Sequence, residues 1–183
     1  MAEYYLISQF PSLDRISENV PVPITEERFM ELCSRFLGKR AWNELQNLTL
    51  VPSVNPEKSA SRLVEAWNDS ERNLRLVLGK VRADKMHKSF DLSDKFLPAE
   101  LYKVANAAVE IENPLEAEMF LLLHRLNCLE MLRPMDAFSE DFVFYYALKL
   151  KLILRIRQFD TKLGESKYKN IYNSILNGVG LEA

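Results

Sequence analysis

The sequence predicts an all-α fold built as a helical bundle. Its apolar residues recur every three or four positions over long stretches, which is the spacing of one helix face. Its β-branched residues are scattered instead of alternating with polar ones, so the pattern does not favour a sheet. With 183 residues, 48% of them hydrophobic and 5 of them glycine, the chain is long enough for one ordinary domain or for two small helical lobes that share a core.

The first half of the chain contains signals for three helices. The apolar opening of the chain, residues 1–10, fits either a helix or a strand. Thr25 is a suitable N-cap for a helix that runs to Gly38, and a second short helix follows through Leu48. Ser59 is then placed to cap a long helix that ends near Met86.

The clearest helix start lies in the second half. Asn113 precedes a proline, and Glu116 follows three residues after the asparagine, which is a capping-box arrangement. Upstream of it, Pro98 suits the first turn of another helix. Pro134 ends the helix that Asn113 opens, so we expect that helix to continue to about Leu132.

The most hydrophobic helix of the chain is predicted after Ser139. Its apolar residues, from Phe142 to Phe159, cover nearly the whole helix circumference. A helix that is apolar on most sides must be central in the fold. Ser166 is suitably placed to cap a last, amphipathic helix.

Two spacings suggest an internal duplication. Ser59 and Ser139 are 80 residues apart, and so are Leu74 and Leu154, each on the long helix that its serine would cap. The matches are few and leucine is common in helices, so a duplication and a chance coincidence both remain open. A duplication would give two pseudo-repeated three-helix lobes, each with one long central helix, at residues 1–88 and 89–183.

Composition excludes several classes of protein. The formal net charge of −2 and the pI near 5.8 argue against binding to a nucleic-acid backbone, which needs a basic excess. Cys33 and Cys128 lie in apolar helical patterns, which favours buried, reduced thiols. The N-terminus lacks the basic region of a signal peptide, and no stretch has the roughly 18 uncharged apolar residues of a membrane span. We therefore expect a cytoplasmic protein that meets a membrane only through its partners.

Residues suited to catalysis are scarce. His87 and His124 are the only histidines, and neither has an identifiable nucleophile or orienting acid beside it. Glycine-rich phosphate loops and the Glu-x-x-His pairing of di-metal bundles are absent. The sequence thus predicts no catalytic, cofactor or metal site and no small-molecule substrate. The alternative is an enzyme whose site is assembled from residues distant in the chain.

Basic residues gather toward the ends of the two long helices, in residues 72–88 and 149–162. In the second group, Lys151, Arg155 and Lys162 are predicted to share one helix face. These cations form either a solvated face favoured by the helix dipole or a surface for an acidic partner.

Three stretches carry a resemblance to known proteins, namely residues 3–7 (EYYLI), 71–80 (ERNLRLVLGK) and 142–151 (FVFYYALKLK) with Leu154 and Arg155 after them. They resemble an uncharacterised bacterial family usually encoded among V-type ATPase subunits. They are also similar to the C-type, or d-type, subunit of the archaeal and vacuolar-type rotary ATPases, whose helices carry a similar Glu-x-x-Asn-Leu-Arg signature. That subunit is a funnel of three repeated helical lobes, and this chain has length for about two.

The resemblance implies a non-catalytic coupling part of a bacterial V-type ATPase that transports protons or sodium ions. Such a part sits on the cytoplasmic face of the membrane rotor ring and receives the central stalk, so rotor-ring and stalk subunits are the implied partners. The candidate partner-binding residues are Glu71, Arg72, Asn73, Arg75, Lys151 and Arg155. Arg75 and Arg155, amid apolar neighbours, are either binding residues or struts between helices. The runner-up interpretation is a free-standing helical adaptor or regulatory module.

Overall fold

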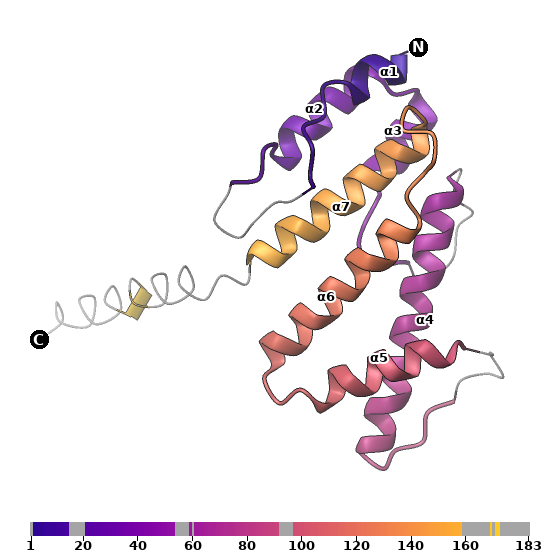
Figure 1. The fold of residues 1–183 in the computed structure, drawn as a ribbon, viewed down its shortest axis with the longest axis vertical. Coiled ribbons are helices and arrows are strands. Elements are labelled where there is room, and N and C mark those ends of the chain that lie inside the picture. The colour runs from indigo at the N-terminus through magenta and orange to yellow at the C-terminus, as the bar shows by residue number, and fades with distance from the viewer. Residues whose placement is uncertain are drawn as a thin grey trace, which may run out of the picture.

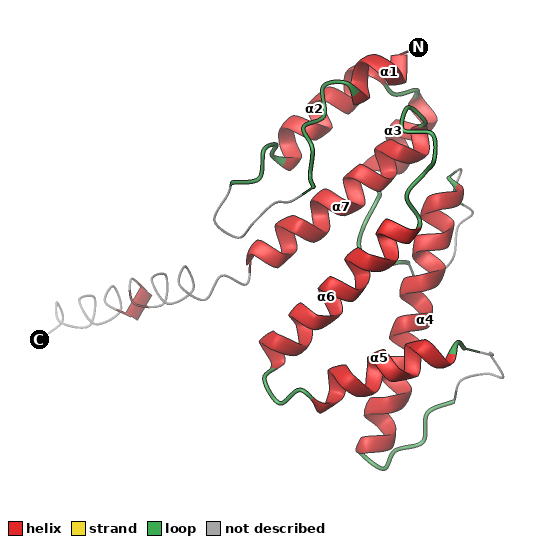
Figure 2. Cartoon of the chain, in the orientation of Figure 1, coloured by secondary structure: helices red, strands yellow, loops and turns green. Residues whose placement is uncertain are grey.

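The computed structural model describes residues 2–14, 21–53, 59, 61–91, 97–158, 169 and 171–172. Within these residues the chain is built from helices and contains no strand, which confirms the predicted all-α class (Figure 2). The helices are α1 (Ala2–Ile7), α2 (Glu26–Phe36), α3 (Lys39–Gln46), α4 (Arg62–Lys85), α5 (Ala99–Glu110), α6 (Pro114–Met131) and α7 (Glu140–Gln158). The helix predicted after Ser166 lies almost entirely outside the described residues.

Three predicted N-caps are confirmed. The Thr25 hydroxyl accepts a hydrogen bond from the Arg28 backbone N–H at 3.2 Å, which starts α2. Asn113 caps α6, and its side-chain amide donates to the Glu116 carboxylate at 2.9 Å. The Ser139 hydroxyl accepts the backbone N–H three residues later at 3.3 Å, just before α7. Each cap satisfies a backbone donor that the first turn of a helix leaves unpaired.

The cap of the long helix α4 differs from the prediction. Ser61 is the N-cap, since its hydroxyl accepts the Val64 backbone N–H at 3.2 Å. Ser59 forms part of the preceding turn, where its hydroxyl accepts the Ser61 N–H at 3.0 Å. The prediction that Ser59 caps this helix is therefore wrong, and the match between Ser59 and Ser139 no longer pairs two caps. The internal duplication stays a prediction, while the predicted helix end at Met86 is confirmed.

Helix α7 is the central element, as its apolar circumference predicted. Ten of its residues between Val143 and Ile153 are buried. Figure 1 shows α7 flanked by α2 on one side and by α6 on the other, and α3 and α4 also pack against it. A helix with neighbours on several sides needs apolar residues on several sides, which is why its sequence shows no clean polar face.

The buried apolar residues form two clusters. The larger cluster surrounds α7 and includes Trp67 of α4 and Leu129 of α6. The smaller cluster lies where α4 packs on α5, and it includes Val77 of α4 and Leu121 of α6. Each cluster combines residues from before and after residue 88, so the two predicted lobes share their cores.

Burial tests the prediction for the two cysteines, and helix length tests the prediction that no stretch spans a membrane. Both cysteines are free thiols, and Cys33 is fully buried as predicted, but Cys128 is partly exposed. None of the described helices is both long enough and apolar enough to cross a membrane.

Candidate functional site

The predicted partner-binding residues lie on two helices. Glu71, Arg72, Asn73 and Arg75 are in the middle of α4, and the other two are near the end of α7. Their exposure differs sharply, because the Glu71 side chain is 2% exposed whereas that of Arg75 is 45% exposed. A carboxylate so buried makes its contacts within the chain. The described contacts of Glu71 are with side chains of its own chain, as in a strut between helices.

Glu71 is the centre of an ion-pair network that crosses three helices. Arg125 of α6 donates from Nε to Glu71 Oε2 at 2.9 Å and from Nη2 to Oε1 at 3.0 Å. Arg75, one turn along α4, donates from Nε to the same Oε1 at 2.8 Å. The Arg125 side chain is only 12% exposed, so the two-bond pair is largely shielded from water. Parallel charge-assisted bonds of this kind fix both distance and orientation between the helices that carry them.

The network continues from α6 to α7 through Glu118. Arg155 of α7 donates from Nη2 to Glu118 Oε1 at 3.2 Å. Arg125 Nη1 lies 3.9 Å from that same oxygen, which joins the two parts of the network. The structure thus brings together Glu71, Arg75 and Arg155, which the sequence singled out, by way of two α6 residues.

The two α6 residues were missing from the predicted site, although the sequence contains a signal for one of them. Arg125 lies three residues after Leu122 and four before Leu129, both of which are buried. This spacing places Arg125 on the apolar face of α6. A cation on an apolar face requires a buried acidic partner, because an unpaired buried charge is very costly. Its partner Glu71, on α4, has no comparable signature in the sequence.

Arg72 and Asn73 are the remaining α4 candidates. Arg72 donates from Nη1 to Asp69 Oδ1 at 3.0 Å, one turn back on the same helix. The Nε of Arg72 is buried and has no hydrogen-bond partner within the described part of the chain. Asn73 is half-buried. Neither residue joins the network around Glu71.

The α7 candidates contact different helices. Lys151 forms an ion pair with Glu26 at the start of α2, whereas Arg155 reaches α6. The predicted common basic face of Lys151 and Arg155 is therefore divided between two intramolecular contacts. Lys162, the third member of that predicted face, lies outside the described residues.

A second polar cluster surrounds Lys149 of α7, which the sequence did not single out individually. Lys149 Nζ lies 2.6 Å from Asp14 Oδ1 and 2.7 Å from Glu130 Oε1. Tyr145, one turn earlier on α7, donates its hydroxyl to Glu130 Oε2 at 2.7 Å. The Tyr146 hydroxyl donates to the backbone carbonyl of Pro11 at 2.8 Å. Together these bonds hold the segment after α1 and the end of α6 against α7.

The protonation of this cluster follows from its contacts. The hydrogen bond from Lys149 lowers the pKa of Asp14 more than burial raises it. Burial raises the pKa of Glu130, but the hydrogen bonds from Lys149 and Tyr145 outweigh it and the net shift is downward. Burial alone would lower the pKa of Lys149, yet the two carboxylates raise it above its ordinary value. At neutral pH the cluster therefore holds one ammonium and two carboxylates.

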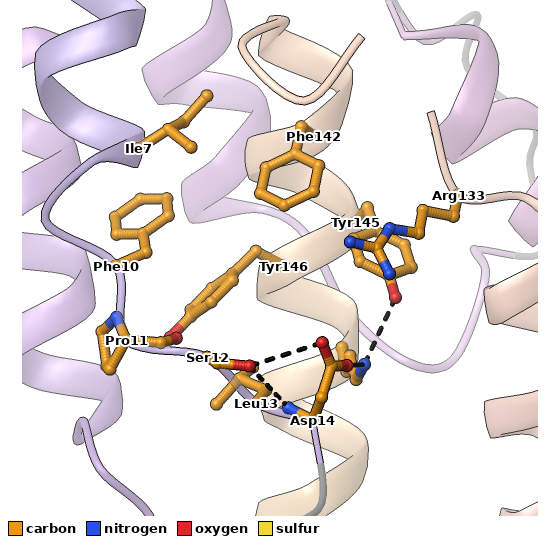
Figure 3. A pocket seen from close by; sticks show the side chains of 11 residues that line it. Ile7, Phe10, Pro11, Ser12, Leu13, Asp14, Arg133, Phe142, Tyr145 and Tyr146 are labelled. Carbon is orange, nitrogen blue, oxygen red and sulfur yellow. Dashed lines mark hydrogen bonds and ion pairs between the residues drawn. The ribbon is translucent and has the colours of Figure 1, made fainter. Parts of the chain in front are cut away.

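A pocket of about 220 Å³ opens beside this cluster, between the segment after α1 and α7 (Figure 3). Its walls are mainly apolar and include Phe10, Phe142 and Tyr146. Its polar residues include Asp14 and Arg133. The Arg133 guanidinium lies over the ring of Tyr145, with 5.8 Å between its central carbon and the ring centroid. Aromatic walls with a few polar groups are typical of small ligand sites.

His124 and Cys128 form the one pairing in α6 that resembles a catalytic arrangement. His124 Nε2 lies 3.4 Å from Cys128 Sγ. Burial lowers the pKa of His124, with a further contribution from the charge of Arg125. Burial also raises the pKa of Cys128. Both shifts favour the neutral forms, which is opposite to the thiolate and imidazolium of an activated cysteine nucleophile.

No protein-family model matches the chain. No curated protein and no solved structure matches it either.

Proposed function

We propose that this chain is a non-catalytic component of a bacterial V-type ATPase, similar to the C-type subunit of the rotary ATPases. In this role it couples the central stalk to the membrane rotor ring during ATP-driven proton or sodium transport. It stays on the cytoplasmic side and reaches the membrane through those partners. The observation that carries the proposal is the position of the resembling stretch 71–80, whose Glu71 and Arg75 lie in the ion-pair network of α4, α6 and α7.

Rigidity is the first reason why this network suits a coupling part. A part that transmits rotation between stalk and ring must keep its shape under load. The Glu71–Arg125 pair joins α4 and α6 by two hydrogen bonds, and Arg155 ties α7 to Glu118 of α6. Breaking a buried ion pair leaves uncompensated charges, so the helices resist sliding past one another.

Positive charge at the surface is the second reason why this network suits a coupling part. Arg75 and Arg155 each keep almost half of the side chain exposed, at 45% and 46%. An arginine has five N–H donors, so one that is exposed to this extent can bind within the chain and to a neighbouring protein at once. Acidic side chains and the carbonyl-rich C-terminal ends of helices are complementary to this cationic surface.

An alternative function, a free-standing helical adaptor, is favoured by a different observation. Exposed apolar side chains gather where α1 meets the connection between α6 and α7. Tyr4 and Phe138 are in ring contact with centroids 4.7 Å apart. Met131, the last residue of α6, is 85% exposed, and Met135 on the connection is fully exposed. Clustered exposed apolar side chains often mark protein interaction sites, whatever the partner.

Co-purification from native membranes tests the proposal. A tagged chain is expected to recover rotor-ring and stalk subunits. The double charge reversal Arg75→Glu with Arg155→Glu is expected to reduce that recovery severalfold, whereas Arg40→Glu with Arg62→Glu, at exposed positions outside the two basic groups, serves as the matched control. Circular dichroism of each purified variant separates loss of docking from loss of folding.

The outcomes separate the two functions. Recovery of soluble partners alone, with a loss in Met135→Ser but not in the arginine variants, would establish the adaptor instead. Unchanged assembly together with unchanged stability in the double variant would contradict both roles considered for Arg75 and Arg155.

A further inference from the structure

The pocket beside α7 has a rigid aromatic wall. The rings of Phe10 and Tyr146 are stacked with centroids 4.6 Å apart, and Phe29 backs Tyr146 at 5.4 Å. The Tyr146 hydroxyl is also held by the carbonyl of Pro11. Because Phe29 and the Pro11 carbonyl fix the position of Tyr146, this wall is preformed for an apolar group.

Most charges at the pocket are already paired. Lys149 is 8% exposed and its ammonium is shared between Asp14 and Glu130. Asp14 also accepts a hydrogen bond from the Ser12 hydroxyl at 3.3 Å. A ligand would have to break these bonds in order to use either charge, so neither of them is the recognition group.

Arg133 differs from its neighbours in this respect. Its guanidinium lies over Tyr145, and Arg133 forms no ion pair within the described residues, although its charge contributes to lowering the pKa of Asp14. Figure 3 shows Arg133 beside Tyr145 and on the same side of the pocket as Phe142. The cation–π contact orients the planar group without using its N–H donors.

We propose that this pocket binds an apolar carboxylate, with the carboxylate on Arg133 and the apolar body against Phe142 and Tyr146. A guanidinium matches a carboxylate with two parallel hydrogen bonds, which no cationic or neutral ligand reproduces. The volume of about 220 Å³ is below the roughly 300–1,000 Å³ of sites for drug-sized ligands, so one ring or a short alkyl chain fills it. Two sources supply this chemistry, a small free acid and the C-terminal residue of a peptide.

A titration of the full chain, followed by its two-dimensional amide NMR spectrum, tests the inference. The probes are hydrocinnamate, hydrocinnamamide as its neutral match, and an acetylated Gly-Gly-Phe peptide with a free C-terminus. Hydrocinnamate is expected to shift the amide signals of Phe10, Phe142 and Tyr146. The neutral amide is expected to bind about fivefold more weakly, which is the effect of one partly exposed ion pair.

Variants at the exposed position 133 keep the test independent of folding. Arg133→Gln is expected to lose the same fivefold for hydrocinnamate but not for the amide, and Arg133→Lys to recover part of it. Arg82→Gln, an arginine on the surface of α4, is the control and is expected to bind like the original chain. Tighter binding of the peptide identifies a chain terminus as the source, and equal binding identifies a small acid. Equal affinity for acid and amide, an unaffected Arg133→Gln variant, or shifts confined to other parts of the chain would overturn the proposal.

Discussion

Glu71 of α4 and Arg125 of α6 are joined by two parallel hydrogen bonds, of 2.9 Å and 3.0 Å, although the residues are 54 positions apart. Their side chains are only 2% and 12% exposed. Arg75 also contacts Glu71, and Glu118 lies near Arg125, but both of these side chains are more exposed. Removal of one member of the buried pair therefore leaves the other charge buried with weaker compensation. This relationship gives the network a measurable role in stability that is separate from any docking.

Replacement of Glu71 by glutamine is expected to lower the free energy of unfolding by about 3 kcal/mol, the lower end of the cost of breaking a buried ion pair. Glutamine has nearly the same shape and retains one acceptor, so the loss reports on charge more than on packing. Urea unfolding followed by circular dichroism measures it. Glu100→Gln is the control, because Glu100 and its partner Lys103 are both well exposed and are expected to contribute at most about 1 kcal/mol. Equal effects of the two replacements would show that the buried pair is not a strut.

The Lys149 cluster predicts a loss of stability in acid. The pKa values of Asp14 and Glu130 are lowered in the folded chain, so both carboxylates bind protons more readily when the chain unfolds. Their contribution is fully present above the ordinary pKa values of 3.8 and 4.5, and it is lost as the pH falls below them. Urea unfolding over a series of pH values is expected to show this decrease.

The variant Lys149→Met identifies the source of that decrease. Without the ammonium, the lowering of both pKa values weakens, so stability in the variant is expected to vary less with pH in this window. Hydrogen exchange is also expected to become faster in residues 10–14, which the Lys149–Asp14 contact holds against α7. A variant with the acid profile of the original chain would show that other carboxylates govern the decrease.

The two thiols are expected to differ in reactivity. Burial raises the pKa of Cys33 to about 12, and its side chain is inaccessible. Cys128 is partly exposed, and burial also raises its pKa. A colorimetric thiol reagent at neutral pH is expected to react slowly with Cys128 in the folded chain and with Cys33 only after unfolding, since the thiolate is the reacting form. The variant Cys128→Ser should remove the slow phase, and a slow phase that persists would contradict the assignment.

The ring of Phe90 is expected to restrict which residues fit at position 79, in the interior of α4. Alanine favours a helix by about 1 kcal/mol over glycine, but a Cβ atom at position 79 would lie 3.0 Å from Phe90 Cζ. We expect Gly79→Ala to change the free energy of unfolding little in the original chain. In a Phe90→Leu background, the same replacement is expected to stabilise by about 1 kcal/mol. The same effect in both backgrounds would show that the ring does not restrict this position.

Local signals predicted most helix boundaries, and their failures have simple causes. Thr25, Asn113 and Ser139 start helices as predicted, because a cap bonds to backbone atoms two or three residues away. The start of α4 was misplaced because Ser59 and Ser61 satisfy the same rule, and the turn that selects between them also involves the Glu44 side chain from another helix. Helix α1 was not assigned since its six residues are too short for a periodic pattern.

By itself the sequence determined the all-α class and the central position of α7, because periodicity and caps depend on neighbours within about four residues. It also selected Glu71, Arg75 and Arg155, which the structure places in one network. Only the tertiary structure decided their partners, and it paired Lys149 with Asp14, 135 residues away. The physical reason is that an ion pair depends on which helix faces are brought together, and many acidic residues in the chain satisfy the local rules equally well.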